Sequence, residues 1–288
     1  STHSSHIVRE VKFADLRYFK RLCASSNCNI PTTKVINLSD VFGKGDETDR
    51  FATRYLQTTH CDLFFADAAI MVEGSAEKIF IPHFIRNKYP QLNQRYITIL
   101  EINGSHAHRL KPLIDKLCLT TLIITDIDPV SQEGRHKSVC PKRDPKIVTG
   151  NDTLKSWVPK ITKLDKLLDI PFEKKVVSHD MPYSYCVRVA YQTPLNINYK
   201  KDITVEALSS TFEDAIIYSN IDLFSSLTGT GLINLFSDLV KNNKDFKELH
   251  SNVYGELHKK NVKKAKFALD LIYSVEPEKI IVPQYISE

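Results

Sequence analysis

The sequence predicts an α/β fold in which a parallel sheet is flanked by helices. Three short apolar runs, at residues 68–72, 97–102 and 122–125, have the length and the β-branched content of buried strands. The segments between them have helical spacing, so the order is β-α-β-α-β, which implies parallel strands joined by right-handed crossovers. A hydrophobic content of 42% in 288 residues is enough for a substantial core.

Short elements are expected before this unit and two helices within it. Residues 13–22 and 33–37 are typical of short strands, and an amphipathic helix is expected to begin at Glu47. The helices of the unit are expected at residues 75–88 and 105–117. Their buried sides are predicted to consist of Ile81, Phe84 and Ile85 in the first helix and Leu110, Leu113, Ile114 and Leu117 in the second.

The chain becomes polar and basic after the third strand, over residues 129–151. A stretch of this kind is either a solvated loop or one that binds a substrate. The basic residues that could pair with backbone phosphates are Arg135, His136, Lys137, Lys142, Arg143 and Lys146.

The remaining residues predict one more strand and an additional helical C-terminal part. The strand, at residues 186–191, is expected to return to the sheet, and a helix should follow at 205–218. A further helix is expected from His258 onward, with Lys266 on the margin of its apolar stripe. That stripe consists of Val262, Ala265, Leu269 and Ile272.

Acidic residues follow the predicted strands, at the edge where parallel sheets bind their ligands. Glu73 and Gly74 follow the first strand, Gly104 the second, and Asp126 and Asp128 the third. Glu77 lies in the first turn of the next helix and brings the carboxylates to four.

Four carboxylates at one edge repel one another, and a cation would relieve that repulsion. Oxygen-only ligands favour Mg²⁺ or Mn²⁺, and such a site can hold two ions about 4 Å apart. Glu73 and Glu77 can face the same ion across the strand-to-helix corner, where Gly74 allows a tight turn. Asp126 and Asp128 would share a face if the strand stayed regular. We expect His106 and His108 to be a solvated helix start rather than ligands.

Composition restricts the compartment and the partners. The net charge of +5 permits a nucleic-acid partner without demanding one. The six cysteines include no Cys-x-x-Cys pair, which favours reduced thiols over a zinc site. No run approaches the roughly 18 apolar residues of a membrane span and no signal segment opens the chain. We therefore expect a cytoplasmic protein with no membrane partner.

The acidic motifs resemble those of the topoisomerase-primase (TOPRIM) domain. They read Val72-Glu73-Gly74-x-x-Glu77, Asn103-Gly104 and Thr125-Asp126-x-Asp128. The surrounding chain, from Ser1 to about Leu271, resembles the TOPRIM variant of the overcoming-lysogenisation-defect (OLD) family of nucleases. The resemblance implies a TOPRIM-type parallel sheet and a metal-dependent nuclease.

Two further site residues come from the resemblance alone. The segment Thr211-Phe212-Glu213-Asp214-Ala215 is similar to one that supplies another metal-site carboxylate, and Glu213 is preferred to Asp214. Lys266, which precedes Phe267 and Ala268, matches the lysine that the family places near its metals. A cation there would stabilise charge on the phosphate in the transition state.

The start of the chain resembles the end of another module. Thr2-His3-Ser4 is similar to the switch-histidine segment of ABC-type ATPases, and the absence of an initiator methionine indicates a fragment. Because the chain has no Gly-x-x-x-x-Gly-Lys-Ser/Thr loop, ATP is expected only through an upstream ATPase module that is absent here. The expected division is 1–60 for the end of that module and a linker, 61–220 for the TOPRIM domain with an insertion, and 221–288 for a C-terminal helical region.

These inferences together predict a DNA endonuclease that nicks or cleaves by a two-metal mechanism. Glu73, Glu77 and Asp126 would hold one ion, and Asp128 and Glu213 would help to hold the second. The alternatives are a TOPRIM strand-transferase and a non-catalytic DNA-binding or clamp module of an ATPase complex. The resemblance allows a homodimer and a helicase or other defence protein as partner, in phage defence or DNA repair.

Overall fold

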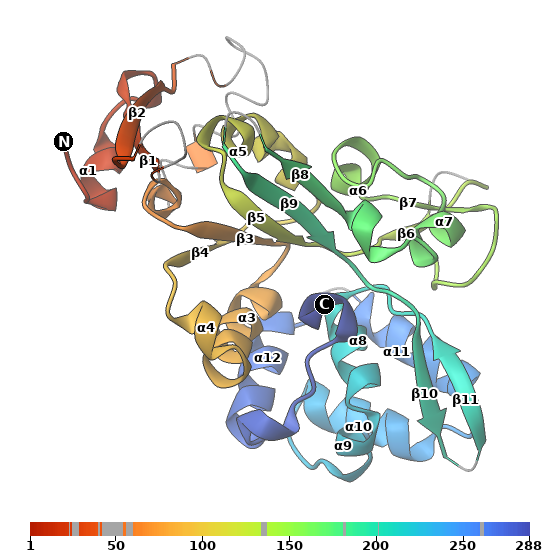
Figure 1. Ribbon diagram of the computed structural model, residues 1–288. Helices are drawn as coiled ribbons and strands as arrows, with labels where there is room; N and C mark the ends of the chain where they lie inside the picture. Colours follow the sequence, from red (N-terminus) through yellow and green to blue (C-terminus); the bar gives the residue numbers. More distant parts are fainter. Residues whose placement is uncertain are drawn as a thin grey trace.

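The fold is described for most of the chain by a computed structural model. It covers residues 1–22, 24, 29–39, 41, 54–55, 60–133, 137–180, 183–200, 202–259 and 262–288. Within these residues the predicted α/β class is confirmed, since a five-stranded sheet in the order β4-β3-β5-β9-β8 is flanked by helices (Figure 1). The helix predicted to begin at Glu47 lies almost entirely outside the described residues.

The sheet contains the predicted strands in a mostly parallel arrangement. Strands β3 (Ala68–Val72), β4 (Ile97–Glu101) and β5 (Thr120–Ile124) are parallel, with Ala68 opposite both Ile97 and Thr120. The chain returns to the sheet as β9 (Tyr185–Ala190), parallel to β5, and β8 (Val176–His179) pairs with β9 in the antiparallel sense. The carboxyl ends of β3, β4 and β5 therefore meet at one edge.

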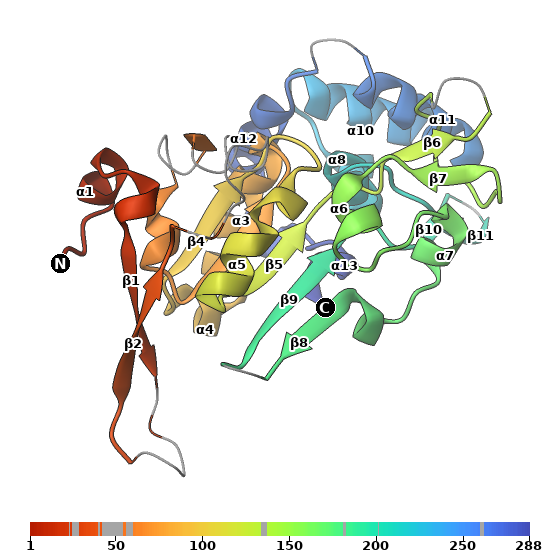
Figure 2. The same ribbon diagram turned by 90° about the horizontal axis from the view of Figure 1, so that it is seen from above.

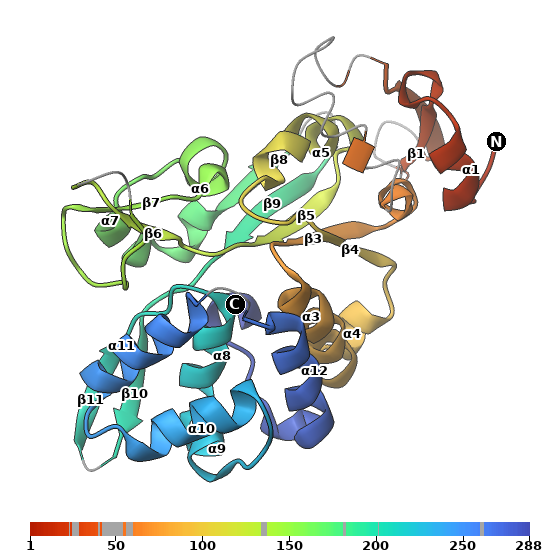
Figure 3. The ribbon, with the colours of Figure 1, turned by 180° about the vertical axis from the view of Figure 1, so that it is seen from behind.

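The two faces of the sheet pack against different groups of elements. Along β3, Ile70 and Val72 join one apolar cluster and Ala69 and Met71 join the other, as the alternation of a strand requires. One face is covered by α3 (Ser75–Lys88), α8 (Phe212–Ser219) and α12 (Lys264–Ser274) (Figure 3). The other face is covered by a 3₁₀ turn (Ala107–Leu110) and α5 (Lys111–Leu117). The second predicted helix is thus present in two parts.

The helical C-terminal part lies on the same side of the sheet as α3. It includes α9 (Ile221–Ser226), α10 (Leu232–Asn242) and α11 (Phe246–Leu257). Phe236 and Phe267 share one apolar cluster with Phe80 of α3 and with Ile70 of the sheet. The C-terminal helices are therefore packed on the sheet through a continuous core. Short helices elsewhere are α4 (Pro90–Asn93), a 3₁₀ turn at Pro277–Lys279 and α13 (Gln284–Ser287).

The N-terminal residues form a hairpin that extends away from the sheet (Figure 2). The helix α1 (Ser5–Glu10) and a 3₁₀ turn (Phe13–Asp15) precede the antiparallel strands β1 (Arg17–Leu22) and β2 (Thr32–Asn37). Lys20 Nζ donates to the carbonyl oxygens of Leu117 at 2.6 Å and Cys118 at 2.9 Å, which ties the hairpin to the end of α5. A 3₁₀ turn at Cys61–Phe64 then leads into β3.

The basic stretch after β5 is more ordered than a loop. It contains the antiparallel strands β6 (Pro129–Ser131) and β7 (Ile147–Thr149), and it is followed by α6 (Asp152–Ser156), α7 (Leu164–Leu168) and a 3₁₀ turn (Phe172–Lys175). Several of its cations pair with acids: Arg143 with Asp169 and Glu206, Lys146 with Glu133, and Lys142 with Asp144. Arg135 and His136 lie outside the described residues. The paired cations are already partly neutralised.

The prediction of a helix at 205–218 is wrong for the first part of that segment. Residues of that segment belong to β11 (Asp202–Ala207), which pairs with β10 (Leu195–Tyr199). The helix α8 begins only at Phe212, because Thr211 and Asp214 form a reciprocal capping box. Cross-strand pairing overrode the helical spacing of the apolar residues.

The register predicted for the last helix is also wrong. Helix α12 begins at Lys264, not near His258, and its buried residues are Phe267, Ala268 and Leu271. Leu269, expected in the stripe, is 57% exposed. The buried positions are three, four and seven residues after Lys264, so Lys264 lies on the same side of the helix as the core. Among the described helices, none has the length and apolar character needed to cross a membrane.

Candidate metal centre at the carboxyl edge of the sheet

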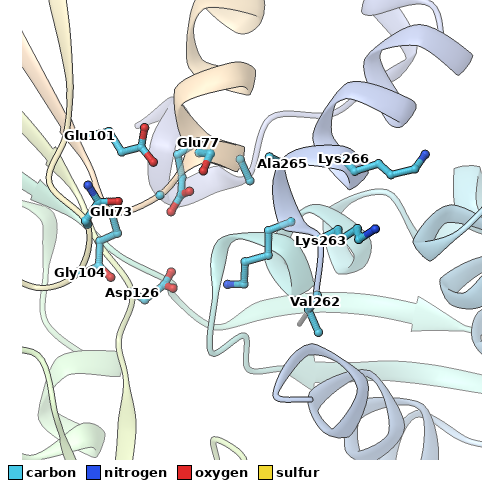
Figure 4. Close-up of a pocket in the computed structure, with 14 residues that line it drawn as sticks. Glu73, Glu77, Glu101, Gly104, Asp126, Val262, Lys263, Ala265 and Lys266 are labelled. Carbon is cyan, nitrogen blue, oxygen red and sulfur yellow. The ribbon is translucent and has the colours of Figure 1, made fainter. Parts of the chain in front are cut away.

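A pocket of about 620 Å³ opens at the edge where the carboxyl ends of the parallel strands meet. It is lined by residues that follow β3 and β4, by Asp126 after β5, and by residues 262–266 at the start of α12. Figure 4 shows Glu73, Glu77, Glu101 and Asp126 gathered on one side of this pocket. Three of the predicted carboxylates are therefore brought together, as the strand order required.

Glu73 is held by hydrogen bonds directly after β3. The Thr125 hydroxyl and the Asn151 amide both donate to Glu73 Oε1, the latter at 2.8 Å. Burial raises the pKa of Glu73 to about 7, and the Asp128 carboxylate adds to the rise. A bound cation would stabilise the ionised form of Glu73 and so lower this raised pKa.

Glu77 lies in the first turn of α3, four residues after Glu73. It is only 4% exposed, and burial together with Glu213 raises its pKa to about 8. A side chain on Gly74 would place its Cβ 3.2 Å from Glu77 Oε2. The backbone of Gly74 is extended, so no unusual conformation requires a glycine here, but a larger residue would crowd the Glu77 carboxylate.

The Asn103-Gly104 turn after β4 does need a glycine. Gly104 has φ of +104° and Asn103 has φ of +56°, both in the left-handed region. The Gly104 amide donates to the Glu73 carbonyl at 3.2 Å, which keeps the two strand ends together. His106 and His108 follow and are half-buried rather than solvated. Burial lowers the pKa of His108, whose Nδ1 lies 3.0 Å from the Ser105 carbonyl oxygen.

Asp126 and Asp128 do not continue a regular strand. Strand β5 ends at Ile124, and Asp128 has φ of +45°. Asp126 is 8% exposed, and burial followed by the charge of Glu73 raises its pKa well above its ordinary value. Burial raises the pKa of Asp128 to about 6, although the nearby ammonium groups of Lys264 and Lys155 oppose the rise. Asp128 contributes to the charge of the cluster without lining the pocket.

Of the two candidate acids at the start of α8, Glu213 faces the cluster. Asp214 is engaged in the capping box, where it accepts from the Ser210 and Thr211 amides at 2.8 Å each. The Glu213 side chain is 1% exposed, and its Oε2 lies 2.7 Å from Lys264 Nζ. In the part of the chain that the structure describes, no hydrogen-bond donor reaches Glu213 Oε1. The geometry therefore favours Glu213 as the ligand, and its role stays a prediction.

The lysine nearest the acids is Lys264, two residues before the predicted Lys266. Burial lowers the pKa of Lys264, but the carboxylates of Glu213 and Asp126 outweigh this and raise it above its ordinary value. Lys266 borders the pocket, yet its ammonium lies 2.6 Å from Asp270 and its side chain is 55% exposed. Figure 4 shows Lys266 and Lys263 extending away from the acids. Lys264 thus lies near the acids, in the position that was expected for Lys266.

The donor chemistry of this edge fits a hard divalent cation. The acids Glu73, Glu77 and Asp126 offer only carboxylate oxygens to the pocket, and the Lys264 ammonium neutralises part of their charge. Behind them, Glu213 Oε1 is buried without a donor in the described part of the chain. Among the described residues, no three His, Cys, Asp or Glu side chains stand close enough to ligate one ion together. Mg²⁺ keeps several waters and often takes only one or two carboxylates, so the site fits such an ion without a closed protein cage.

Two buried amides that sequence reasoning did not assign to the site contact its acids. Asn151, which directly precedes α6, donates to Glu73 Oε1 at 2.8 Å, and Gln192 Nε2 donates to Asp126 Oδ1 at 2.7 Å. The capping position of Asn151, just before α6, was a signal in the sequence. Gln192 had none, because its contact depends on β9 lying beside β5.

Comparison with known proteins agrees with the resemblance seen in the motifs. The chain is 26% identical to Endonuclease GajA of Bacillus cereus (strain HuB5-5), across 98% of the chain and 40% of that relative. The C-terminal region of the Burkholderia pseudomallei OLD protein superposes with a TM-score of 0.40 at 19% identity, covering 77% of the chain and 94% of that structure. Residues 64–128 match the family described as overcoming lysogenization defect protein-like, TOPRIM domain. This matched segment contains Glu73, Glu77, Asp126 and Asp128, so these four acids lie in the part of the chain that is similar to the OLD-like TOPRIM domain.

Proposed function

We propose that this chain is the nuclease part of an OLD-type protein and hydrolyses DNA phosphodiester bonds with divalent metal ions. The observation that carries the proposal is the gathering of Glu73, Glu77 and Asp126 at one pocket. The TOPRIM match and the similarity to Endonuclease GajA support a nuclease-type function. Because the chain spans 40% of that relative, the relative's activity is carried to this chain only as part of the proposal.

The acids divide into two groups by their position. Glu73, Glu77 and Asp126 line the pocket and would move closer together to hold one ion, since no three acids among the described residues are close enough to do so. Asp128 and Glu213 would help to hold a second ion. Bound ions of this kind supply Lewis-acid stabilisation and activate a water molecule. Burial and mutual repulsion raise the pKa of Glu73 to about 7 and of Glu77 to about 8, so this chain would bind cations better as the pH rises.

Lys264 is proposed to stabilise the negative charge of the phosphate. Its ammonium is held at the acids by Glu213, and it borders the same pocket as Asp126. A fixed positive charge beside the reacting phosphate favours a transition state in which negative charge increases. Lys266 keeps its predicted role only if its ammonium leaves Asp270.

The pocket also determines how substrate could approach. It is bordered by Lys263 and Lys266, whose side chains extend outward and away from the acids (Figure 4). Exposed lysines at such a rim can contact backbone phosphates without reading the base sequence. DNA is therefore the proposed substrate, and the ATPase module expected upstream remains part of the proposal.

The test is cleavage of supercoiled plasmid by this chain in Mg²⁺, Mn²⁺ or Ca²⁺, with a chelator as control. We expect nicked or linear product in Mg²⁺ or Mn²⁺ and none in excess chelator, because hard ions prefer carboxylate oxygens. A matched variant, Glu256→Gln, changes an acid that pairs with Lys259 and does not line the pocket, and it should retain cleavage. Equal cleavage in excess chelator would rule out the metal-dependent reaction. Binding of DNA without cleavage in any of these ions would favour a clamp module.

A further inference from the structure

Two buried amide side chains contact the acids of the pocket from outside the matched TOPRIM segment. Asn151 is 0% exposed and Gln192 is 1% exposed. Neither lies within residues 64–128, which match the family. Asn151 follows β7, and Gln192 follows β9. Two separate elements therefore bring a neutral hydrogen-bond donor to the same edge.

The side-chain oxygen of Asn151 caps a helix, and its side-chain nitrogen contacts an acid of the pocket. Its Oδ1 caps α6 by accepting from the Thr153 amide at 2.9 Å and the Leu154 amide at 3.2 Å. Its Nδ2 lies 2.8 Å from Glu73 Oε1 and 2.7 Å from Thr125 Oγ1. Because the cap fixes the oxygen end, the nitrogen end has a fixed direction toward Glu73.

Gln192 is anchored in the same manner. Its Oε1 accepts from the Ile127 amide at 2.8 Å, and its Nε2 donates to Asp126 Oδ1 at 2.7 Å. One side chain thus joins the backbone after Asp126 to the carboxylate of Asp126 itself. Rotation of that carboxylate would break its hydrogen bond with the buried Gln192 amide, and a buried donor left without a partner is costly.

Neutral amides suit this task for an electrostatic reason. A lysine or arginine in the same place would cancel the negative charge that attracts a cation, whereas an amide orients one oxygen and leaves the net charge unchanged. Both side-chain donors to Glu73 reach Oε1, and Gln192 reaches Oδ1 of Asp126. The Asp126 backbone also hydrogen-bonds to Glu73. In the proposal, the carboxylate oxygens that these amides do not contact face the ligand.

We propose that Asn151 and Gln192 are positioning residues that orient Glu73 and Asp126 for divalent-cation binding. This inference rests on the proposed function, because it assigns the two amides to the same metal site. Partners of metal ligands typically change metal affinity by about 10- to 100-fold when they are replaced. The amides should therefore act on affinity and on carboxylate position, not only on stability.

The test uses Asn151→Ser, since serine also caps helices but cannot reach Glu73 with a donor amide. The control is Asp245→Ser, which also leaves a serine at a helix cap, that of α11, but at a residue that does not line the pocket. Gln192→Met is the second variant, because it keeps the side-chain length without the donor. Mn²⁺ affinity is measured by calorimetry at one pH, and metal-free crystal structures of wild type and Asn151→Ser locate the Glu73 carboxylate.

We expect Asn151→Ser to weaken Mn²⁺ binding by about tenfold or more and to displace the Glu73 carboxylate, with Asp245→Ser unchanged in both. Wild-type affinity together with an unmoved Glu73 in Asn151→Ser would overturn the inference and leave the proposed function intact. Absence of Mn²⁺ binding and of cleavage in the wild-type chain would instead refute the proposed function. In that case the crystallographic position of Glu73 alone decides whether Asn151 positions it.

Discussion

The acidic edge of the sheet and the helix α12 contribute opposite charges to one pocket, but they differ in how well the sequence predicts them. At the edge, the predicted positions of Glu73, Glu77 and Asp126 agree with the structure. In α12 the predicted start and buried stripe are wrong, and Lys264 lies where Lys266 was expected. The ends of paired strands are fixed by local apolar runs, whereas the direction of a helical side chain changes by about 100° for each residue by which the register is misjudged.

The largest expected effect is at the acidic edge. Asp126→Asn should abolish cleavage, because the carboxylate is proposed to hold the metal ion. The metal-free melting temperature should hold or rise, since burial and the charge of Glu73 raise the pKa of Asp126 well above its ordinary value and the ionised form is disfavoured. Plasmid cleavage and calorimetry measure the two effects. A variant that melts much lower and still cuts DNA would make Asp126 a structural residue.

The next effect compares the two lysines of α12 directly. Lys264→Met should lower turnover at saturating DNA by about 100-fold or more, the scale of losing one donor to a charged transition state. Lys266→Met, whose ammonium pairs with Asp270, should change turnover little. Single-turnover cleavage at several DNA concentrations separates rate from affinity. The reverse result would restore Lys266 to the site and indicate that its ammonium leaves Asp270 when DNA binds.

The register of α12 can be tested by stability alone. Leu271→Ala should cost about 2–5 kcal/mol of unfolding free energy, because Leu271 is fully buried. Leu269→Ala should cost less than about 1 kcal/mol, because Leu269 is 57% exposed. Urea denaturation of both variants measures the difference. Equal losses would contradict the observed side of the helix and favour the stripe predicted from spacing.

The smallest effect is the pH dependence of the metal-free protein. Glu73 and Glu77 have pKa values raised from 4.5 to about 7 and about 8, chiefly by burial. Their stabilising contribution is therefore complete below about pH 4.5 and is lost as the pH rises through 7 to 8. The melting temperature should fall by on the order of 5 °C between pH 6 and pH 8.5, and Glu77→Gln or added Mg²⁺ should reduce the fall. A melting temperature that rises over this range would contradict the raised values.

Sequence reasoning was accurate where a residue's position depends on its own neighbours. The runs that became β3, β4 and β5 and the helix Ser75–Lys88 needed only periodicity and length. It was inaccurate where partners came from far along the chain. Residues of the segment expected to form a helix before Phe212 became β11, because a neighbouring strand offered them backbone hydrogen bonds.

By itself, the sequence determined that several carboxylates follow parallel strands and so meet at one edge, since strand pairing in register aligns the strand ends. Only the tertiary structure decided which other groups reach that edge. It directs Glu213 to Lys264 and Asp214 to a helix cap, and it places Gln192 beside Asp126. The physical reason is that these contacts depend on the packing of distant elements against the sheet, and the spacing of residues within one segment carries no information about that packing.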